Sequence, residues 1–193
     1  MRKIISIIQS KSSGKNVLIF FIPAMIIYMS MFFFTIPNVE KYANGMKIFD
    51  LSPGGYSFAY ANELLTNLGR PGRYVYLHKQ LPLDFLYPGL FAISSCILLS
   101  WLFLKSISKS SKIFYLCFIP IIAGIFDYTE NLFIVSFIER YPGISPIQVG
   151  ISSIATIVKS VSTALYFIVL LFAVITYFIK RIKVITKTAN KTN

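Results

Sequence analysis

Four apolar runs dominate the chain, and each is long enough to cross a bilayer as a helix. About 20 residues of α-helix span the hydrocarbon layer, because each residue adds about 1.5 Å. Backbone groups inside the hydrocarbon need partners within the chain, which helices provide. The expected fold class is therefore an all-α membrane protein with four transmembrane helices in a bundle. The predicted spans are 17–36, 85–104, 113–138 and 151–179.

Hydrophobic residues make up 55% of the chain and charged residues only 13%, against about a quarter in soluble domains. Residues 1–193 are therefore expected to form a single integral membrane domain, with 37–84 as its one long loop. The formal net charge is +12, but lysine and arginine gather in short segments beside the apolar runs. This placement favours membrane lipids with anionic headgroups at the cytoplasmic face as partners, and it argues against nucleic acid.

The distribution of lysine and arginine predicts the orientation of the chain. Four basic residues precede the first run, three lie in 105–112 and five lie in the tail from Lys180, whereas Arg140 stands alone in the third loop. By the positive-inside rule, both termini are cytoplasmic and loop 37–84 lies outside a cell membrane. That loop also carries five basic residues, but long loops weigh less in the rule and its four acids offset part of the charge.

Local signals in the long loop predict an outer amphipathic surface helix over 53–68. Ser52 suits the N-cap, and Gly69 suits the position just after the helix end. Tyr56 and Tyr60 begin an apolar stripe that repeats at every fourth residue. Such a helix is expected to lie on the membrane surface or to cap the bundle.

The chain after this helix is expected to turn at 70–73 and then to form a short helix over 74–80 that leads into the second span. Arg70 and Arg73 in the turn are candidate headgroup contacts. His78 is the only histidine of the chain. It is a further binding candidate, although a local hydrogen bond at the membrane interface is the simpler interpretation.

Two carboxyl groups and an amide interrupt the third run. Asp127, Glu130 and Asn131 share one face of the predicted helix, because residues three and four apart are neighbours on a helix. The same face continues through Ala123 and Gly124, and small residues of this kind let helices approach closely in lipid. We expect this face to meet other helices, and ionisable residues inside a membrane indicate a functional site.

Two further ionisable residues reach a similar depth from other helices. Lys159 belongs to a polar stripe of the fourth span, and Asp84 lies between two prolines at the start of the second. Counted from the cytoplasmic ends of their helices, both lie roughly 31 Å along, and Glu130 lies roughly 27 Å along. We therefore expect these side chains to face the bundle interior, with Lys159 in contact with Glu130 or Asp127, directly or through one water.

This cluster has two interpretations. The excess of acid over base favours an outward-facing site that binds or modifies a lipid-like or amphipathic molecule, with Asp84, Asp127 and Glu130 as catalytic candidates. Alternatively, the protein is a non-enzymatic accessory or structural subunit, whose cluster only fixes helix packing and whose outer loop docks a membrane-protein partner. The remaining binding candidates are Asn131, Lys159, Arg70, Arg73, His78, Tyr56 and Tyr60.

Other chemistries lack the residues they need. Cys96 and Cys117 lie inside apolar runs without ligand spacing, so we expect them in the core and expect no metal site. No phosphate-binding glycine loop or nucleophile elbow occurs, so no cofactor is expected. Ion translocation would need polar residues on the cytoplasmic side of Asp127, where the third span offers only Tyr115 and Cys117. The pattern names no reaction, substrate or oligomeric state, so it leaves open whether the protein is an enzyme.

Three segments of the chain resemble uncharacterised bacterial four-helix integral membrane proteins. They are GYSFAYANELLTNLGRPGRYVYL at 55–77, QLPLDFLYP at 80–88 and DYTEN at 127–131. The resemblance implies the four-span fold and no particular activity. In architecture alone, four spans with membrane-embedded acids are also similar to the sterol isomerase and sigma-2 receptor group, whose motifs are not evident in this chain.

Overall fold

The structure is a computed structural model that describes residues 2–192, with the side chains of 3–183 and Thr186. Arg2, Lys187 and Lys191 of the basic ends lie outside the described side chains. Every regular element in the described part is helical. In chain order these elements are α1 (Arg2–Lys11), α2 (Gly14–Ser30), η1 (Met31–Thr35), α3 (Ile36–Glu40), η2 (Phe49–Leu51), α4 (Phe58–Val75), η3 (Tyr76–Gln80), α5 (Leu81–Ser106), η4 (Lys112–Phe118), α6 (Ile119–Arg140) and α7 (Pro146–Thr192).

Four helical stretches are long and apolar enough to cross a membrane. Each of them contains one of the four spans predicted from the sequence. The prediction of an all-α chain with four helices able to span a membrane is therefore confirmed. The stretches are Gly14–Glu40, Phe58–Ser106, Lys112–Arg140 and Pro146–Lys183.

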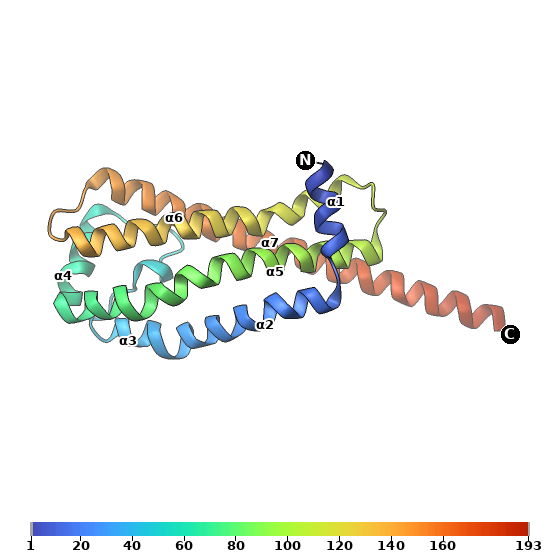
Figure 1. Cartoon of the computed structure of the whole chain (residues 1–193), viewed down its shortest axis with the longest axis horizontal. Coiled ribbons are helices and arrows are strands. Elements are labelled where there is room, and N and C mark those ends of the chain that lie inside the picture. Colours follow the sequence, from blue (N-terminus) through green and yellow to red (C-terminus); the bar gives the residue numbers. More distant parts are fainter. Residues whose placement is uncertain (1, 193) are drawn as a thin grey trace.

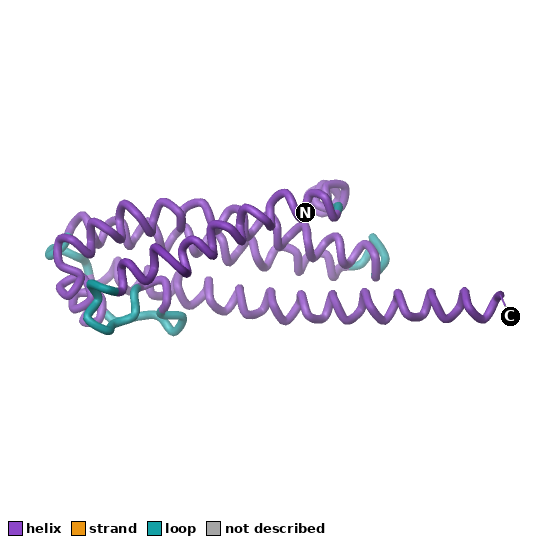
Figure 2. Tube along the Cα trace, turned by 90° about the horizontal axis from the view of Figure 1, so that it is seen from below, coloured by secondary structure: helices purple, strands orange, loops and turns teal. Residues whose placement is uncertain are grey.

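The four long helices run side by side, with α5 between α2 and α6 (Figure 1). α2 packs mainly on α5, whereas α7 packs on both α6 and α5. The view from below shows α7 continuing past the other helices toward the C-terminus (Figure 2). Because α2 and α7 have little contact with each other, helix packing leaves one side of the bundle open between them.

Two apolar clusters fill the interior, one toward each end of the bundle. The first joins the long loop, α4 and α6, with Phe49 and Phe137 fully buried in it. The second joins α1, α5, η4 and α7 around Phe103. Cys96 and Cys117 belong to this second cluster, as predicted for core residues. Five of the predicted site residues lie on α5, α6 and α7, and they are Asp84, Asp127, Glu130, Asn131 and Lys159.

The N-terminal segment forms a helix that the sequence analysis did not predict. α1 is amphipathic, with Ile5 and Ile8 packed against the second cluster and Ile4 half exposed. It lies across the end of the bundle (Figure 1), where Gln9 Nε2 donates a hydrogen bond to Lys109 O at 3.0 Å. Its isoleucines, spaced for one helical face, were the signal that could have identified it.

The start of the predicted helix 53–68 is wrong. α4 begins after Ser57, whose side chain accepts the capping hydrogen bond, and the predicted cap Ser52 precedes a turn instead. Gly55 explains the difference, since its φ of 80° does not fit a helix. A Cβ atom at Gly55 would also collide with Ser153 of α7. The loop thus stays non-helical here and packs closely on α7.

The predicted end of this helix is confirmed at Gly69, whose φ of 57° interrupts α4. Helix resumes immediately, so the predicted turn at 70–73 is wrong, because Pro71 suits the first turn of a new helix. The second part runs without a break through η3 into α5, as predicted for 74–80. The apolar face of α4, including the fully buried Leu64, packs into the first cluster.

Candidate functional site

The polar face of α6 is buried between helices, as predicted. Asp127 is 8% exposed, and Glu130 and Asn131 are fully buried. On the same face, a Cβ atom added to Gly124 would lie 3.0 Å from Pro88 O of α5. The absence of a side chain at Gly124 therefore brings the two helix backbones together at the level of the polar residues.

Lys159 of α7 forms the predicted ion pairs with this face. Its Nζ lies 3.1 Å from Asp127 Oδ1 and also contacts Glu130 Oε2. Thr156, one turn earlier on α7, donates a hydrogen bond from Oγ1 to Glu130 Oε1 at 2.5 Å. Glu130 is thus held by two groups of α7 and has no exposed surface, whereas the Lys159 and Asp127 side chains are 16% and 12% exposed.

Asn131 satisfies a backbone carbonyl that a proline leaves free. Pro88 has no N–H group, so Asp84 O, four residues earlier, lacks its usual helical donor. Asn131 Nδ2 donates to Asp84 O at 2.9 Å, across the contact between α6 and α5. This contact joins the two helices next to the Asp84 side chain.

Asp84 lies beside a carboxyl group that the sequence analysis did not select. Asp50, in η2 of the long loop, lines the same cavity as Asp84. Tyr76 Oη donates a hydrogen bond to Asp50 Oδ2 at 2.6 Å. Two of the remaining oxygens, Asp50 Oδ1 and Asp84 Oδ2, are buried without a hydrogen-bond partner. Asp50 therefore belongs to the candidate site.

Tyr56 contacts the cluster only through α7. Its Oη lies 2.6 Å from Ser152 Oγ, and its backbone N donates to Ser153 Oγ at 2.8 Å. Burial, and to a smaller extent the charge of Glu130, raises the pKa of the Tyr56 phenol. The phenol therefore stays neutral and can donate to Ser152. Tyr56 anchors the long loop on the helix that carries Lys159.

Tyr60 and Arg73 make contacts with the protein backbone, away from the ion pairs. Tyr60 Oη donates to Lys47 O at 2.6 Å. Arg73 donates to Leu65 O at 2.6 Å, and its guanidinium carbon lies 4.4 Å from the centre of the Tyr141 ring. Tyr60 thus ties α4 to the long loop, whereas Arg73 ties the two parts of α4 together. Neither residue lines the cavity that lies beside the ion pairs, between α2 and α7.

His78 and Arg70 also lie outside the cavity beside the ion pairs. The His78 ring stacks on the Tyr74 ring with 4.3 Å between centres, and His78 Nδ1 lies 3.1 Å from Tyr74 O. The local hydrogen bond expected for His78 is therefore present. Arg70 is exposed at the start of the second part of α4.

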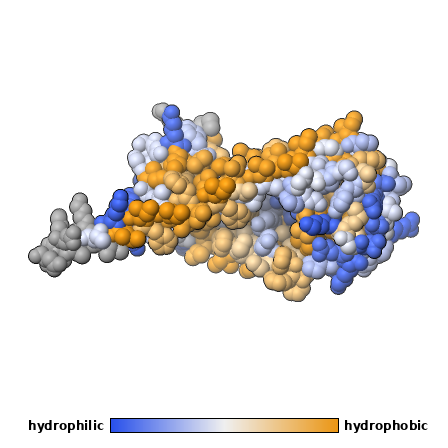
Figure 3. Space-filling view, turned by 180° about the vertical axis from the view of Figure 1, so that it is seen from behind, coloured by the Kyte–Doolittle hydropathy of each residue, from blue (hydrophilic) through white to orange (hydrophobic). Residues whose placement is uncertain are grey.

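A cavity of about 460 Å³ opens beside the ion pairs, between α2 and α7. Figure 3 shows this side of the molecule, with a hollow beneath the apolar ridge of α7. Glu130 does not line the cavity, because it lies behind Asp127 and Lys159. The charged side chains that line it are Asp50, Asp84, Asp127 and Lys159.

A second cavity, of about 500 Å³, continues along the same helices toward the second apolar cluster. Its lining is mainly apolar and includes Met25 of α2, Leu98 of α5 and Leu170 of α7. We call the two cavities together the α2–α7 groove, because five residues line both of them. These shared residues are Tyr28, Tyr87, Phe91, Thr163 and Phe167. The groove thus has a charged end and an apolar end.

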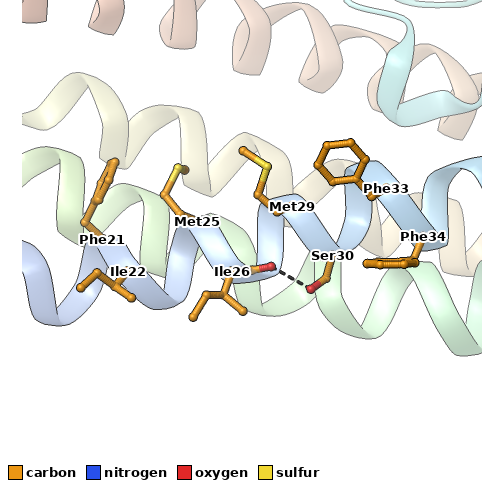
Figure 4. Close-up of a pocket in the computed structure, with 8 residues that line it drawn as sticks. All are labelled: Phe21, Ile22, Met25, Ile26, Met29, Ser30, Phe33 and Phe34. Atoms are coloured by element: carbon orange, nitrogen blue, oxygen red, sulfur yellow. Dashed lines mark hydrogen bonds between the residues drawn. The ribbon is translucent and has the colours of Figure 1, made fainter.

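A hollow on the outer face of α2 has a different character (Figure 4). All the residues that line it come from α2 and η1, so no second helix encloses it. Ser30 provides the one hydroxyl among the residues drawn, and it donates to Ile26 O of the same helix at 2.8 Å. Phe33 and Phe34 are 61% and 73% exposed there. This surface suits contact with lipid chains and offers no reactive group.

Comparisons with known proteins do not indicate a function for this chain. No protein-family model matches the chain, and no curated protein or solved structure matches it. The resemblance to uncharacterised bacterial four-helix membrane proteins therefore stays a prediction. Within residues 2–192, no group of three or more His, Cys, Asp or Glu side chains is arranged to hold a metal ion.

Proposed function

We propose that the protein holds a lipid-like or amphipathic molecule in the α2–α7 groove and binds or modifies its polar end. The observation that carries the proposal is the continuity of the groove, with charged residues at one end and apolar side chains at the other. A polar head at the charged end and a tail along the helices would match both parts. Such a molecule would enter from the bilayer, through the open side between α2 and α7.

Asp84 and Asp127 are the acid–base candidates in this proposal, because both line the charged end of the groove. General acid–base catalysis requires a group within about 3 Å of the proton that it transfers. Glu130 is fully buried behind these residues, so its proposed part is to hold Lys159 in position. Lys159 would supply the counter-charge for Asp127 and a contact for an anionic part of the ligand.

The alternative function is that of a non-enzymatic accessory subunit, and the polar contacts between the helices favour it. Lys159 and Thr156 hold Glu130, and Asn131 holds the free carbonyl of α5, so the cluster ties three helices together. In that case the long loop would dock a membrane-protein partner. Blocking the groove would then leave the function unchanged, whereas it would abolish a function that depends on a ligand.

In the proposed orientation, the charged end of the groove lies toward the outside of a cell membrane. The basic segments that the positive-inside rule places in the cytoplasm lie at the α1 end of the bundle, and α4 lies at the opposite end (Figure 1). α4 would then be the outer amphipathic helix, with its apolar face covering the bundle.

Cysteine labelling tests this orientation. Lys41→Cys, at an exposed position of the long loop, should react with a membrane-impermeant maleimide in intact cells. Ser110→Cys, exposed at the other end, should react only after permeabilisation. Cys96 and Cys117 are buried, so the wild-type protein measures the background. The reverse pattern would place the charged end on the cytoplasmic side and contradict an outward-facing site.

A tryptophan inside the groove should prevent ligand binding. Thr163 lines both cavities, so Thr163→Trp would fill the point where they join. The measurement is photolabelling in nanodiscs by hexadecanol that carries a diazirine in its chain, and we expect labelling of groove peptides to fall roughly tenfold. The control is Val161→Trp, because Val161 is 53% exposed on α7 and lines neither cavity. Equal labelling of the two variants would favour the accessory function.

A further inference from the structure

The charged end of the α2–α7 groove contains more acid than base. Asp50, Asp84 and Asp127 line it together with Lys159 as the base. Lys159 contacts both Asp127 and Glu130, so its charge is already shared between two carboxylates. Among the described side chains, no lysine or arginine forms an ion pair with Asp50 or Asp84. The negative charge of this pair is therefore not compensated by a basic residue.

Two acceptor atoms at this end also lack donors. Asp50 Oδ1 and Asp84 Oδ2 are buried without a hydrogen-bond partner, and Asp84 as a whole is only 5% exposed. Buried polar atoms almost always have partners, and an unpaired one requires an explanation. Tyr76 already satisfies Asp50 Oδ2, and Asn131 satisfies only the backbone oxygen of Asp84. Asp50 and Asp84 both line the cavity, so a group bound there is one source of the missing donors.

We infer that the groove takes a long-chain molecule with a primary ammonium head, whose N–H groups donate to Asp50 and Asp84 while the chain occupies the apolar end. This inference rests on the proposed function. A primary ammonium group carries one positive charge and three donors, so one head group can serve both oxygens. A phosphate head would meet like charge, a hydroxyl would bring no charge, and a trimethylammonium head has no N–H donor.

A single proton shared by Asp50 and Asp84 is the competing arrangement. It would satisfy both unpaired oxygens, Asp50 Oδ1 and Asp84 Oδ2, without any ligand, because a protonated carboxyl group donates one hydrogen bond. The two arrangements differ in what they predict for binding. The shared proton gives the groove no preference for an amine, whereas the ammonium site gives it a strong one.

Competition in nanodiscs of phosphatidylcholine tests the inference. The diazirine-bearing hexadecanol labels the groove, and dodecylamine, dodecyltrimethylammonium, dodecanol and dodecyl phosphate compete with it. These competitors share one chain length, so their heads alone differ. We expect dodecylamine to displace the label at a concentration roughly tenfold lower than the other three require.

Asp84→Asn should remove the advantage of dodecylamine over dodecanol, and Asp50→Asn provides a second variant should the first fail to fold. Glu139→Gln is the control, because Glu139 is exposed and lies outside both cavities.

Dodecanol or dodecyl phosphate competing as well as the amine would overturn the inference while leaving the groove as a binding site. Equal competition by dodecyltrimethylammonium would overturn the role of the N–H donors. Absence of any groove labelling would instead overturn the proposed function.

Discussion

Replacing Lys159 by leucine should destabilise the protein by about 3 kcal/mol. The substitution leaves Asp127 and Glu130 without their counter-charge, and the Glu130 side chain is fully buried. Removing one partner of a buried ion pair is strongly unfavourable, because the remaining charge loses its compensation but stays out of water. A single polar contact between membrane helices is worth only about 1 kcal/mol, so a larger loss would identify the uncompensated charge as the cause.

Unfolding in detergent micelles with increasing amounts of SDS measures this loss. Adding Glu130→Gln to Lys159→Leu should recover part of the stability, since glutamine keeps the shape of glutamate and removes its charge. Lys79→Leu is the matched control, because Lys79 is exposed and the substitution also removes one lysine. A double variant that is no more stable than Lys159→Leu alone would contradict the explanation by buried charge.

The second large effect is expected for Gly124→Leu, which should prevent α5 and α6 from packing. Even a Cβ atom at Gly124 would lie 3.0 Å from Pro88 O and 3.1 Å from Ala92 Cβ. Neither atom can move without moving the backbone of α5, so a leucine must push the helices apart. Size-exclusion chromatography in mild detergent should show loss of most of the folded, monodisperse protein.

Gly150→Leu on α7 is the control for this substitution. A Cβ atom there would have no neighbour within 4 Å, so the leucine should be accommodated and should even favour the helix. If Gly124→Leu folded as well as Gly150→Leu, close packing of α5 on α6 would not be needed for the fold. The alignment of Asn131 with the free carbonyl of Asp84 would then need another explanation.

The parts of the site that belong to long helices could be predicted from the sequence. Helical periodicity places Asp127 and Glu130 on one face, and the same rule places Lys159 on a polar stripe that meets them. Pro88 lacks the N–H group that would bond Asp84 O four residues earlier, and Asn131 satisfies this carbonyl. In these cases one regular geometry links the sequence position of a residue to its direction in space.

Residues of the long loop could not be placed in the same way. Asp50 has no periodic neighbours to indicate its direction, and only the packing of the whole loop brings it to the cavity that Asp84 also lines. Tyr60 and Arg73 were selected as binding candidates by residue type, yet their polar atoms pair with backbone carbonyl groups of the long loop and α4. Which of many acceptors a long side chain reaches depends on tertiary contacts that the sequence does not state.

The open side between α2 and α7 determines which part of a ligand can contribute to selectivity. A chain that enters the groove from the bilayer exchanges one apolar medium for another. It therefore gains little of the roughly 0.8 kcal/mol per methylene that it would gain on leaving water. Chain length then governs how much of a molecule dissolves in the membrane, and the carboxyl groups at the end of the groove govern which of the dissolved molecules stays bound.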